Sequence, residues 1–206
     1  MAEFKSTPLL TQRFQDATQF ALDLHKHQTR KTTGAPYASH LLSVCGLVLA
    51  HGGDEDEAIA ALLHDSLEDH PDRCSPELIA RCFGERVLAL VLECTDTHPS
   101  AKDGGKAPWL ERKQAFLERL RTQELLGPRI LLADKTDNLR ATLFGYQTQG
   151  EQIWSYFRAN REQQIWYFQS FFDLIKTKTV PPALLSDFEQ VLAHLLLLMK
   201  ERNKAA

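Results

Sequence analysis

The sequence predicts an all-α protein, a bundle of about eight to ten helices in a single domain that covers residues 1–206. Apolar residues recur three and four positions apart in one segment after another, whereas strand-like alternation and clusters of β-branched residues are scarce. Gly, Pro and capping residues fall between these segments. With 206 residues, 43% of them hydrophobic, the chain is long enough to bury its own core.

Most of the expected helices begin or end at a recognisable signal. Asp54 can cap the third helix, and Ser75 followed by Pro76 is typical of a helix start. The break TRKTTGAP at 29–36 separates the first two helices, and Gly84 interrupts the fourth. We expect helices over about 9–27, 37–50, 55–68, 76–94, 109–122, 128–146, 160–176 and 182–203.

The charge balance argues against a nucleic-acid partner, because the formal net charge is −3 and nucleic-acid-binding proteins carry a basic excess. A small anionic substrate held by a few local cations is compatible with it. The first residues, MAEFKSTPLL, lack the basic start and long apolar stretch of a signal peptide. The strongly apolar run 195–199 is too short to span a bilayer. We therefore expect a cytoplasmic protein with no membrane segment.

The segment 58–69, AIAALLHDSLED, carries the strongest chemical signal. On a helix, His64 and Glu68 lie one turn apart, as do Asp65 and Asp69, and the two rows are adjacent. One helix end would then present an imidazole and three carboxylates in one patch. Such groups crowd together comfortably only with water or a cation between them. A solvated helix end is the plainer interpretation of the two acids after the His-Asp pair.

Two residues elsewhere in the chain strengthen the hypothesis of a metal site. His40 lies on the preceding helix, just after the break at 29–36. Asp134 follows the apolar run ILLA at 130–133, where an uncompensated carboxylate would be costly. Two histidines and two aspartates suit Mn²⁺, Fe²⁺ or Zn²⁺ and leave coordination positions open.

Several runs of the sequence together resemble the HD phosphohydrolase superfamily. More narrowly, they resemble the hydrolase domain of RelA/SpoT-type enzymes and its single-domain relatives, the small alarmone hydrolases. The runs are HKHQTRKTTGAPYASHL, AALLHDSLED, FGERVLALV, ERK and LLADKTDNLR. They occur in the family's order, and HDSLED together with ADKTDNLR is specific. The resemblance implies an HD-domain helical bundle.

The resemblance also implies roles for the matching residues. The metal ligands would be His40, His64, Asp65 and Asp134, with Mn²⁺ as the usual ion and other divalent metals possible. Glu68 and Asp69 match the acidic pair that positions or deprotonates the attacking water, and the sequence does not say which of them is the base. A bound divalent ion would make hydroxide available near neutral pH.

Four further residues would contact the substrate. Arg30 and Lys31 match a pair at the mouth of the family's pocket, where Arg30 could lie flat on a purine and Lys31 could pair with phosphate. Asn138, one turn after Asp134, resembles an asparagine near the ribose and the metal. Lys113, the Lys of ERK, could bring positive charge to a pyrophosphate. Whether Tyr37 reaches the pocket or only packs the loop stays open.

The implied reaction is manganese-dependent hydrolysis of the 3′-pyrophosphate of guanosine tetra- or pentaphosphate, which yields GDP or GTP and pyrophosphate. Two alternatives stay open. The same site could remove the 2′-phosphate of NADPH or act on another purine nucleotide. A non-catalytic nucleotide sensor is less favoured, because such a protein would be expected to have lost a ligand or the acidic pair, and this chain keeps both.

Some regions depart from the family pattern. Ala141 stands where many long RelA/SpoT enzymes have Thr, and the polar loop 96–108 has no close match. Its Lys102 and Lys106, like Arg112 after it, are more typical of a solvated face than of a phosphate site.

The last third of the chain is the least informative about function. Trp166, Tyr167 and Phe171 in the aromatic region 154–172 recur at helical spacing, which predicts core packing. The apolar helix at 182–203 either completes the core or meets another subunit. The oligomeric state therefore stays open.

Overall fold

The computed structural model describes residues 10–96 and 107–205, and over these ranges the chain is all-α. An isolated β-bridge between Thr29 and Pro36 is the one β feature in this part of the chain. The elements are α1 (Gln12–Leu24), α2 (Ala38–Ala50), α3 (Glu55–Leu63), α4 (Ser66–Asp69), α5 (Pro76–Phe83), α6 (Glu85–Cys94), α7 (Trp109–Thr122), α8 (Pro128–Gln149), a 3-10 helix η1 (Gly150–Tyr156), α9 (Arg161–Ile175) and α10 (Pro182–Ala205). The predicted fold class is confirmed.

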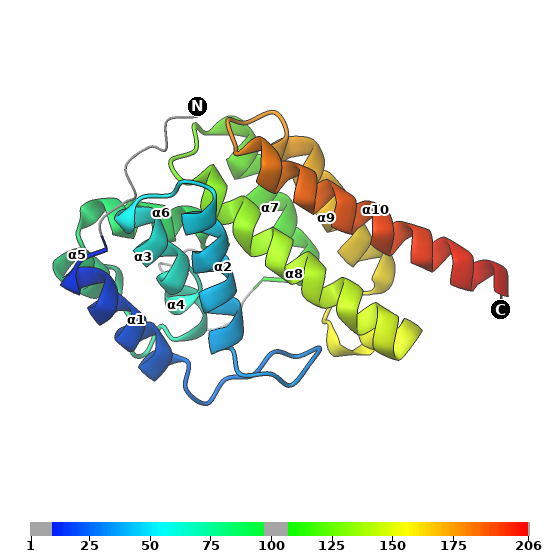
Figure 1. The fold of residues 1–206 in the computed structure, drawn as a ribbon, viewed down its shortest axis with the longest axis horizontal. Helices are drawn as coiled ribbons and strands as arrows, with labels where there is room; N and C mark the ends of the chain where they lie inside the picture. Colours follow the sequence, from blue (N-terminus) through cyan, green and yellow to red (C-terminus); the bar gives the residue numbers. More distant parts are fainter. Residues whose placement is uncertain (1–9, 97–106, 206) are drawn as a thin grey trace, which may run out of the picture.

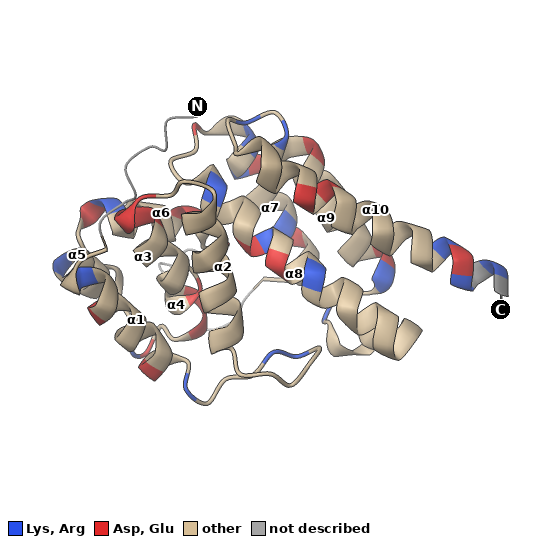
Figure 2. Cartoon of the chain, viewed as in Figure 1, with Lys and Arg blue, Asp and Glu red and all other residues tan. Residues whose placement is uncertain are grey.

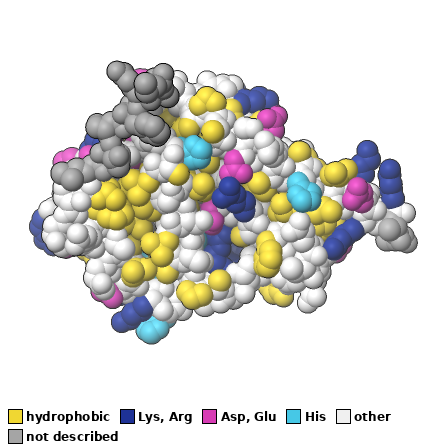
Figure 3. All heavy atoms as spheres, viewed as in Figure 1, with side chains coloured by type: hydrophobic (Ala, Val, Ile, Leu, Met, Phe, Trp, Pro, Cys, Tyr) yellow, Lys and Arg dark blue, Asp and Glu magenta, His cyan; other side chains and the backbone are white. Residues whose placement is uncertain are grey.

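Helices α2 and α8 pack against each other through the middle of the molecule (Figure 1). On the α2 side, α3 contacts α1 and α6, and α5 contacts α6. On the α8 side lie α9 and α10, with α7 packed on α9. Figure 2 shows that acidic and basic residues alternate on the middle of α8, and Figure 3 shows charged side chains of both signs near the middle of the same face.

The two segments that carry the metal hypothesis lie deepest in this arrangement. All residues of α3 from Ala58 to Leu63 are buried, and so is the start of α8 from Ile130 to Ala133. Each run is apolar on every side because helices cover it from several directions. His64 and Asp134 directly follow these buried runs. Both side chains are therefore buried in the interior of the molecule.

The expected single helix over 55–68 is interrupted. It starts as predicted, with a reciprocal capping box between Asp54 and Glu57. It ends at Leu63, and the separate short helix α4 begins at Ser66. The Nδ1–H of His64 donates to the carbonyl of Ala61 at 2.8 Å, and this carbonyl is the acceptor that the next backbone amide would use in a continuing helix. The side chain thus competes with the helix ladder, and the His-Asp pair sits in a turn.

Helix α10 meets a length and composition criterion for crossing a membrane over Pro182–Arg202, a criterion that core helices of globular proteins also satisfy. It packs against α8 and α9. Its buried residues recur at three- and four-residue spacing and are Leu184, Phe188, Leu192, Leu195 and Met199. This face agrees with a helix that completes the core, whereas Leu197 on another face is 54% exposed.

Replacing Gly84 by Ala is expected to lower the free energy of unfolding by about 1–3 kcal/mol. Gly84 joins α5 to α6 with φ +97° and ψ 160°, a conformation that side chains with a Cβ avoid. The nearest heavy atom to an added Cβ would be Nη1 of Arg13 at 3.8 Å, so the cost comes from the backbone and not from a clash. Urea unfolding followed by circular dichroism measures the change.

The matched control for this prediction is Gly46→Ala on the exposed side of α2. A Cβ there meets nothing within 4 Å, and the helix interior favours Ala by about 0.5–1 kcal/mol. Equal stabilities of the two variants would contradict the prediction.

Candidate metal centre

Four side chains from three parts of the chain converge on one point between α2, α3 and α8. His40 comes from α2, His64 and Asp65 from the turn after α3, and Asp134 from α8. Nε2 of His40 lies 3.6 Å from Oδ2 of Asp65 and 3.4 Å from Oδ1 of Asp134. Nε2 of His64 lies 3.0 and 3.7 Å from the same two atoms. The ligand atoms of the two histidines and Asp65 all lie within 4.8 Å of one another.

The surroundings of His64 leave one ring nitrogen for a cation. Its Nδ1–H is bonded to the carbonyl of Ala61, so in the neutral ring Nε2 carries the lone pair. This Nε2 is buried and makes no hydrogen bond of good geometry, but it lies 3.0 and 3.7 Å from the carboxylates of Asp65 and Asp134. A metal ion between Nε2 and the two carboxylates would be held by all three groups. The donor set of two imidazoles and two carboxylates therefore fits a divalent cation of the Mn²⁺, Fe²⁺ or Zn²⁺ type.

His40 is held in the same way by a carboxylate behind it. Its Nδ1 lies 2.7 Å from Oδ2 of Asp137, which fixes the proton on Nδ1 and turns Nε2 toward the cluster. Burial by itself lowers the pKa of His40, but hydrogen bonds to Asp134, Asp137 and Asp65 outweigh burial and raise the pKa to about 9. The site thus attracts positive charge strongly, whether as protons or as a metal ion.

The two aspartates of the cluster are held ionised. Burial raises the pKa of Asp134, but Lys135 and the two imidazoles outweigh it and hold the pKa well below its usual value. The pKa of Asp65 is lowered likewise, against burial, by His64 and His40. The hydroxyl of Tyr37 also donates to Asp65. The question left open for Tyr37 is settled by this contact: the residue belongs to the site.

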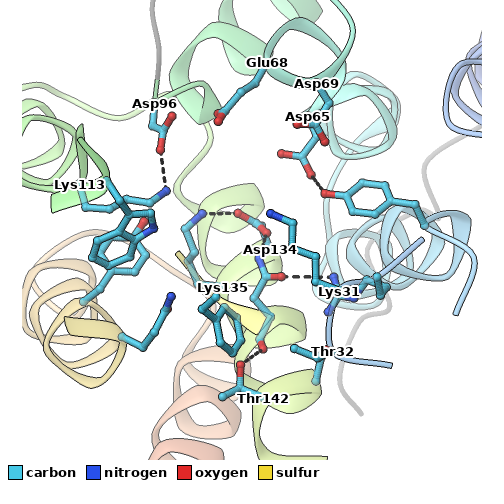
Figure 4. Close-up of a pocket in the computed structure, with 18 of the residues that line it drawn as sticks. Lys31, Thr32, Asp65, Glu68, Asp69, Asp96, Lys113, Asp134, Lys135 and Thr142 are labelled. Carbon is cyan, nitrogen blue, oxygen red and sulfur yellow. Dashed lines mark hydrogen bonds and ion pairs between the residues drawn. The ribbon is translucent and has the colours of Figure 1, made fainter. Parts of the chain in front are cut away.

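The acidic pair lies next to the cluster. Figure 4 shows the Glu68 carboxylate turned toward the centre of the pocket, with Asp69 beside Asp65. Oδ2 of Asp69 accepts a hydrogen bond of 2.7 Å from the Gln28 amide. Glu68 lies 3.5 Å from Nη1 of Arg112, so Arg112 faces this site and not only solvent. The proximity that the sequence predicts for the two acids and the His-Asp pair is therefore present despite the helix break.

The cluster opens onto a pocket of about 340 Å³. Every residue with a predicted substrate contact lines it, namely Arg30, Lys31, Asn138 and Lys113. Lys31 is exposed at the rim, whereas Nζ of Lys113 is paired with Oδ2 of Asp96 at 2.6 Å. Lys102 and Lys106 lie outside the described residues.

Several residues of this pocket are absent from the sequence-based site. Lys135 is buried, pairs with Asp134 and lies 6.0 Å from the centroid of the Tyr167 ring. Trp109, Gln164 and Phe168 also line the pocket. Lys135 directly follows the predicted ligand Asp134, and this position in the sequence could have identified it as a site residue.

The prediction of core packing for the aromatic region is incomplete, because Tyr167 is both buried and part of the pocket wall. Phe171 is buried as expected, and Trp166 is half-buried and packs against the core. One apolar face of a helix beside a pocket can both pack against the core and line the pocket. Helical periodicity alone therefore does not distinguish core residues from pocket residues.

Comparison with known proteins identifies the class of domain. A sequence profile of the HD domain matches residues 17–165, and the chain belongs to the HD-domain family. An HD domain implies a divalent-metal site, and the His/Asp cluster supplies suitable groups.

Relatives with assigned names indicate which kind of HD-domain protein this chain resembles. The guanosine-3′,5′-bis(diphosphate) 3′-pyrophosphohydrolase MESH1 of Drosophila melanogaster is 34% identical over 131 residues, which cover 62% of this chain and 68% of that protein. A guanosine-3′,5′-bis(diphosphate) 3′-pyrophosphohydrolase of Aquifex aeolicus is 35% identical over 136 residues, 65% of this chain but 18% of that longer protein. These matches confirm the resemblance to RelA/SpoT-type hydrolases.

Solved structures agree with the sequence relatives. A metazoan SpoT ortholog, described as hydrolysing ppGpp, superposes with a TM-score of 0.69 at 27% identity, over 90% of this chain and 96% of that one. A protein of Listeria monocytogenes gives a TM-score of 0.63 at 28% identity, over 78% of this chain and 99% of that one. The predicted HD-domain fold is thus confirmed by sequence and by structure.

Proposed function

We propose that this protein hydrolyses the 3′-pyrophosphate of guanosine tetra- and pentaphosphate with Mn²⁺, and that His40, His64, Asp65 and Asp134 hold the ion. The observation that carries the proposal is the convergence of the buried Nε2 atoms of His40 and His64 on the carboxylates of Asp65 and Asp134, beside a pocket with basic side chains. The names of the Drosophila and Aquifex relatives supply the substrate.

When bound, the divalent cation would lower the pKa of a water molecule toward neutrality and offset the negative charge of a phosphoryl group. The protein's own groups do the rest. Glu68 or Asp69 accepts the proton of the attacking water. The new bond joins the water oxygen to the phosphorus next to the ribose. The bond from that phosphorus to the ribose 3′-oxygen breaks, and the oxygen takes a proton.

The basic residues at the pocket suit a nucleotide with two diphosphate groups. The guanidinium edge of Arg30 is bonded to Asn138 at 3.2 Å and to Asp137 at 3.2 Å, which leaves its flat face for a purine ring. Lys31 at the rim and Lys113 on the opposite wall bring positive charge to the phosphates. Asn138 bridges Arg30 and Asp134 and lines the pocket, so its side chain is available to contact the ribose.

The test is a substrate panel with the purified full chain, stripped with chelator and then supplied with Mn²⁺, Zn²⁺ or Mg²⁺. We expect pyrophosphate and GDP from guanosine tetraphosphate with Mn²⁺, and no turnover in chelator. Phosphate from NADPH without pyrophosphate from the tetraphosphate would overturn the proposed substrate in favour of 2′-phosphate hydrolysis. Nucleotide binding without turnover in any metal would favour a sensor.

Binding of Mn²⁺ at pH 7.5 is expected to release about one to two protons per ion. The pKa of His40 is raised to about 9, so both nitrogens of its ring are protonated at pH 7.5 before the ion binds. The pKa of His64 is also raised, against burial, by Asp65 and Asp134, which adds to the protons that the ion displaces. A metal ligand must be neutral imidazole, and lower pH therefore weakens binding while a rise toward pH 9 strengthens it. Calorimetry in buffers of different ionisation enthalpy counts the protons, and a count near zero would contradict the prediction.

A further inference from the structure

The loop of residues 29–36 reaches the neighbours of the metal cluster through the side chain of Arg30. Arg30 reaches from this loop to α8, where Nη2 lies 3.2 Å from Oδ2 of Asp137 and Nη1 donates to Oδ1 of Asn138 at 3.2 Å. Nη2 also reaches the Asp137 carbonyl at 3.5 Å. The Arg30 side chain is only 10% exposed, so these contacts are made in a largely dry environment, where charge-assisted hydrogen bonds are strong.

Both partners of Arg30 in turn hold a proposed metal ligand. Oδ2 of Asp137, the atom that Arg30 contacts, is also the atom that accepts from Nδ1 of His40 at 2.7 Å. Asn138 accepts from Arg30 through Oδ1 and donates through Nδ2 to Oδ1 of Asp134. The amide orientation of Asn138 is therefore fixed by a donor on one side and an acceptor on the other. The Arg30 guanidinium is thus connected to His40 through Asp137 and to Asp134 through Asn138.

The remaining ties of the loop do not touch the cluster. The loop closes on itself through the Thr29–Pro36 bridge and the hydrogen bond from Arg30 N to the Ala35 carbonyl at 2.8 Å. Nε2 of Gln149, near the far end of α8, donates to the Thr32 carbonyl at 3.0 Å. The chain therefore offers two anchors between the same loop and the same helix, and only one of them leads to the metal ligands.

We propose that Asp137 and Arg30 are positioning residues that couple the order of loop 29–36 to metal occupancy. Asp137 fixes the tautomer and direction of His40, and Arg30 locks Asp137 and Asn138 in place. A cation that orders His40 and Asp134 also orders Asp137 and Asn138, which then bind Arg30 more firmly. Because coupling between sites is reciprocal, an Arg30 side chain bound in this way raises the affinity of the site for the cation. The inference rests on the metal site of the proposed function, but it concerns residues that touch no ion.

The first test measures Mn²⁺ affinity by calorimetry at fixed pH. We expect Asp137→Asn to weaken binding about 10- to 100-fold, as other carboxylates behind histidine ligands do, and Arg30→Gln to weaken it about tenfold. Gln149→Ala, which cuts the other anchor, is the matched control and should bind within about twofold of wild type. Because Arg30 acts largely through Asp137, the double variant should be much less impaired than the product of the two single effects.

The second test measures the reverse effect by limited trypsin digestion. Lys31 is exposed in the loop, so cleavage after it reports how firmly the loop is anchored. We expect saturating Mn²⁺ to slow this cleavage at least fivefold in wild type and in Gln149→Ala, but less than twofold in Asp137→Asn. Thermal unfolding in chelator shows whether a variant still folds: each variant should unfold in one cooperative transition well above the temperature at which binding and digestion are measured.

The outcomes separate the two proposals. If wild type binds Mn²⁺ and Arg30→Gln binds it equally well, the coupling is overturned and the metal site stands. If Gln149→Ala weakens binding as much as Arg30→Gln, general loosening of the loop explains the result and the specific role of Arg30 is overturned. If wild type binds neither Mn²⁺ nor Zn²⁺, the metal site fails and the coupling fails with it.

Discussion

Replacing Asp65 by Asn is expected to lower kcat/KM at least about a thousandfold, equivalent to ~4 kcal/mol of transition-state stabilisation, without unfolding the protein. Asp65 is the proposed ligand whose loss costs the fold least, since its side chain is 25% exposed whereas that of His64 is 1% exposed. The Asn carbonyl oxygen can still accept from Tyr37. What the variant loses is a negative charge 3.0 Å from the buried Nε2 of His64.

The Asp65→Asn variant is tested by three measurements, namely turnover, Mn²⁺ affinity and thermal stability. We expect the first two to fall together and the third to change little in chelator. Asp173→Asn on the exposed end of α9, which removes an exposed carboxylate paired with Lys176, is the matched control and should retain activity. Full turnover by Asp65→Asn would show that the metal site lies elsewhere.

Replacing Glu68 by Gln is expected to lower kcat about 10²- to 10⁴-fold, the usual contribution of a positioned general base, while Mn²⁺ affinity stays within a few-fold of wild type. The carboxylate faces the centre of the pocket (Figure 4). Gln keeps the size of the side chain and can still contact Arg112, so the lost property is the ability to take a proton. Stopped assays at saturating substrate, with binding followed by calorimetry, separate the two effects.

The parallel variant Asp69→Asn decides between the two acids. The Asn oxygen can still accept from the Gln28 amide. We expect a smaller loss than at Glu68 because the Glu68 carboxylate is the one turned toward the centre of the pocket (Figure 4). A larger loss at Asp69 would exchange the roles. Near-wild-type kcat in both variants would overturn the proposal that either acid deprotonates the water. Glu118→Gln on the exposed face of α7 controls for the loss of one carboxylate on this domain.

Most helices were predictable because their signals are local. The boundaries at 109–122 match α7, and those near 160–176 and 128–146 match α9 and α8 to within a few residues. The helix over 55–68 was predicted as continuous, because the pattern of apolar residues does not report that a histidine side chain competes for a backbone carbonyl. A local hydrogen bond between a side chain and the backbone leaves no trace in the period of the apolar residues.

The sequence by itself determined the fold class, the family and the candidate groups of the site, because helical periodicity and the spacing of HDSLED and ADKTDNLR are properties of short segments. Only the tertiary structure decided how these groups work together. It placed Asp137 behind His40, paired Arg30 with Asp137 and Asn138, and set Lys135 and Tyr167 in the pocket wall. The contacts of Asp137 with His40 and of Arg30 with Asp137 and Asn138 join residues about a hundred positions apart, and packing between α2, α8 and the 29–36 loop brings them together.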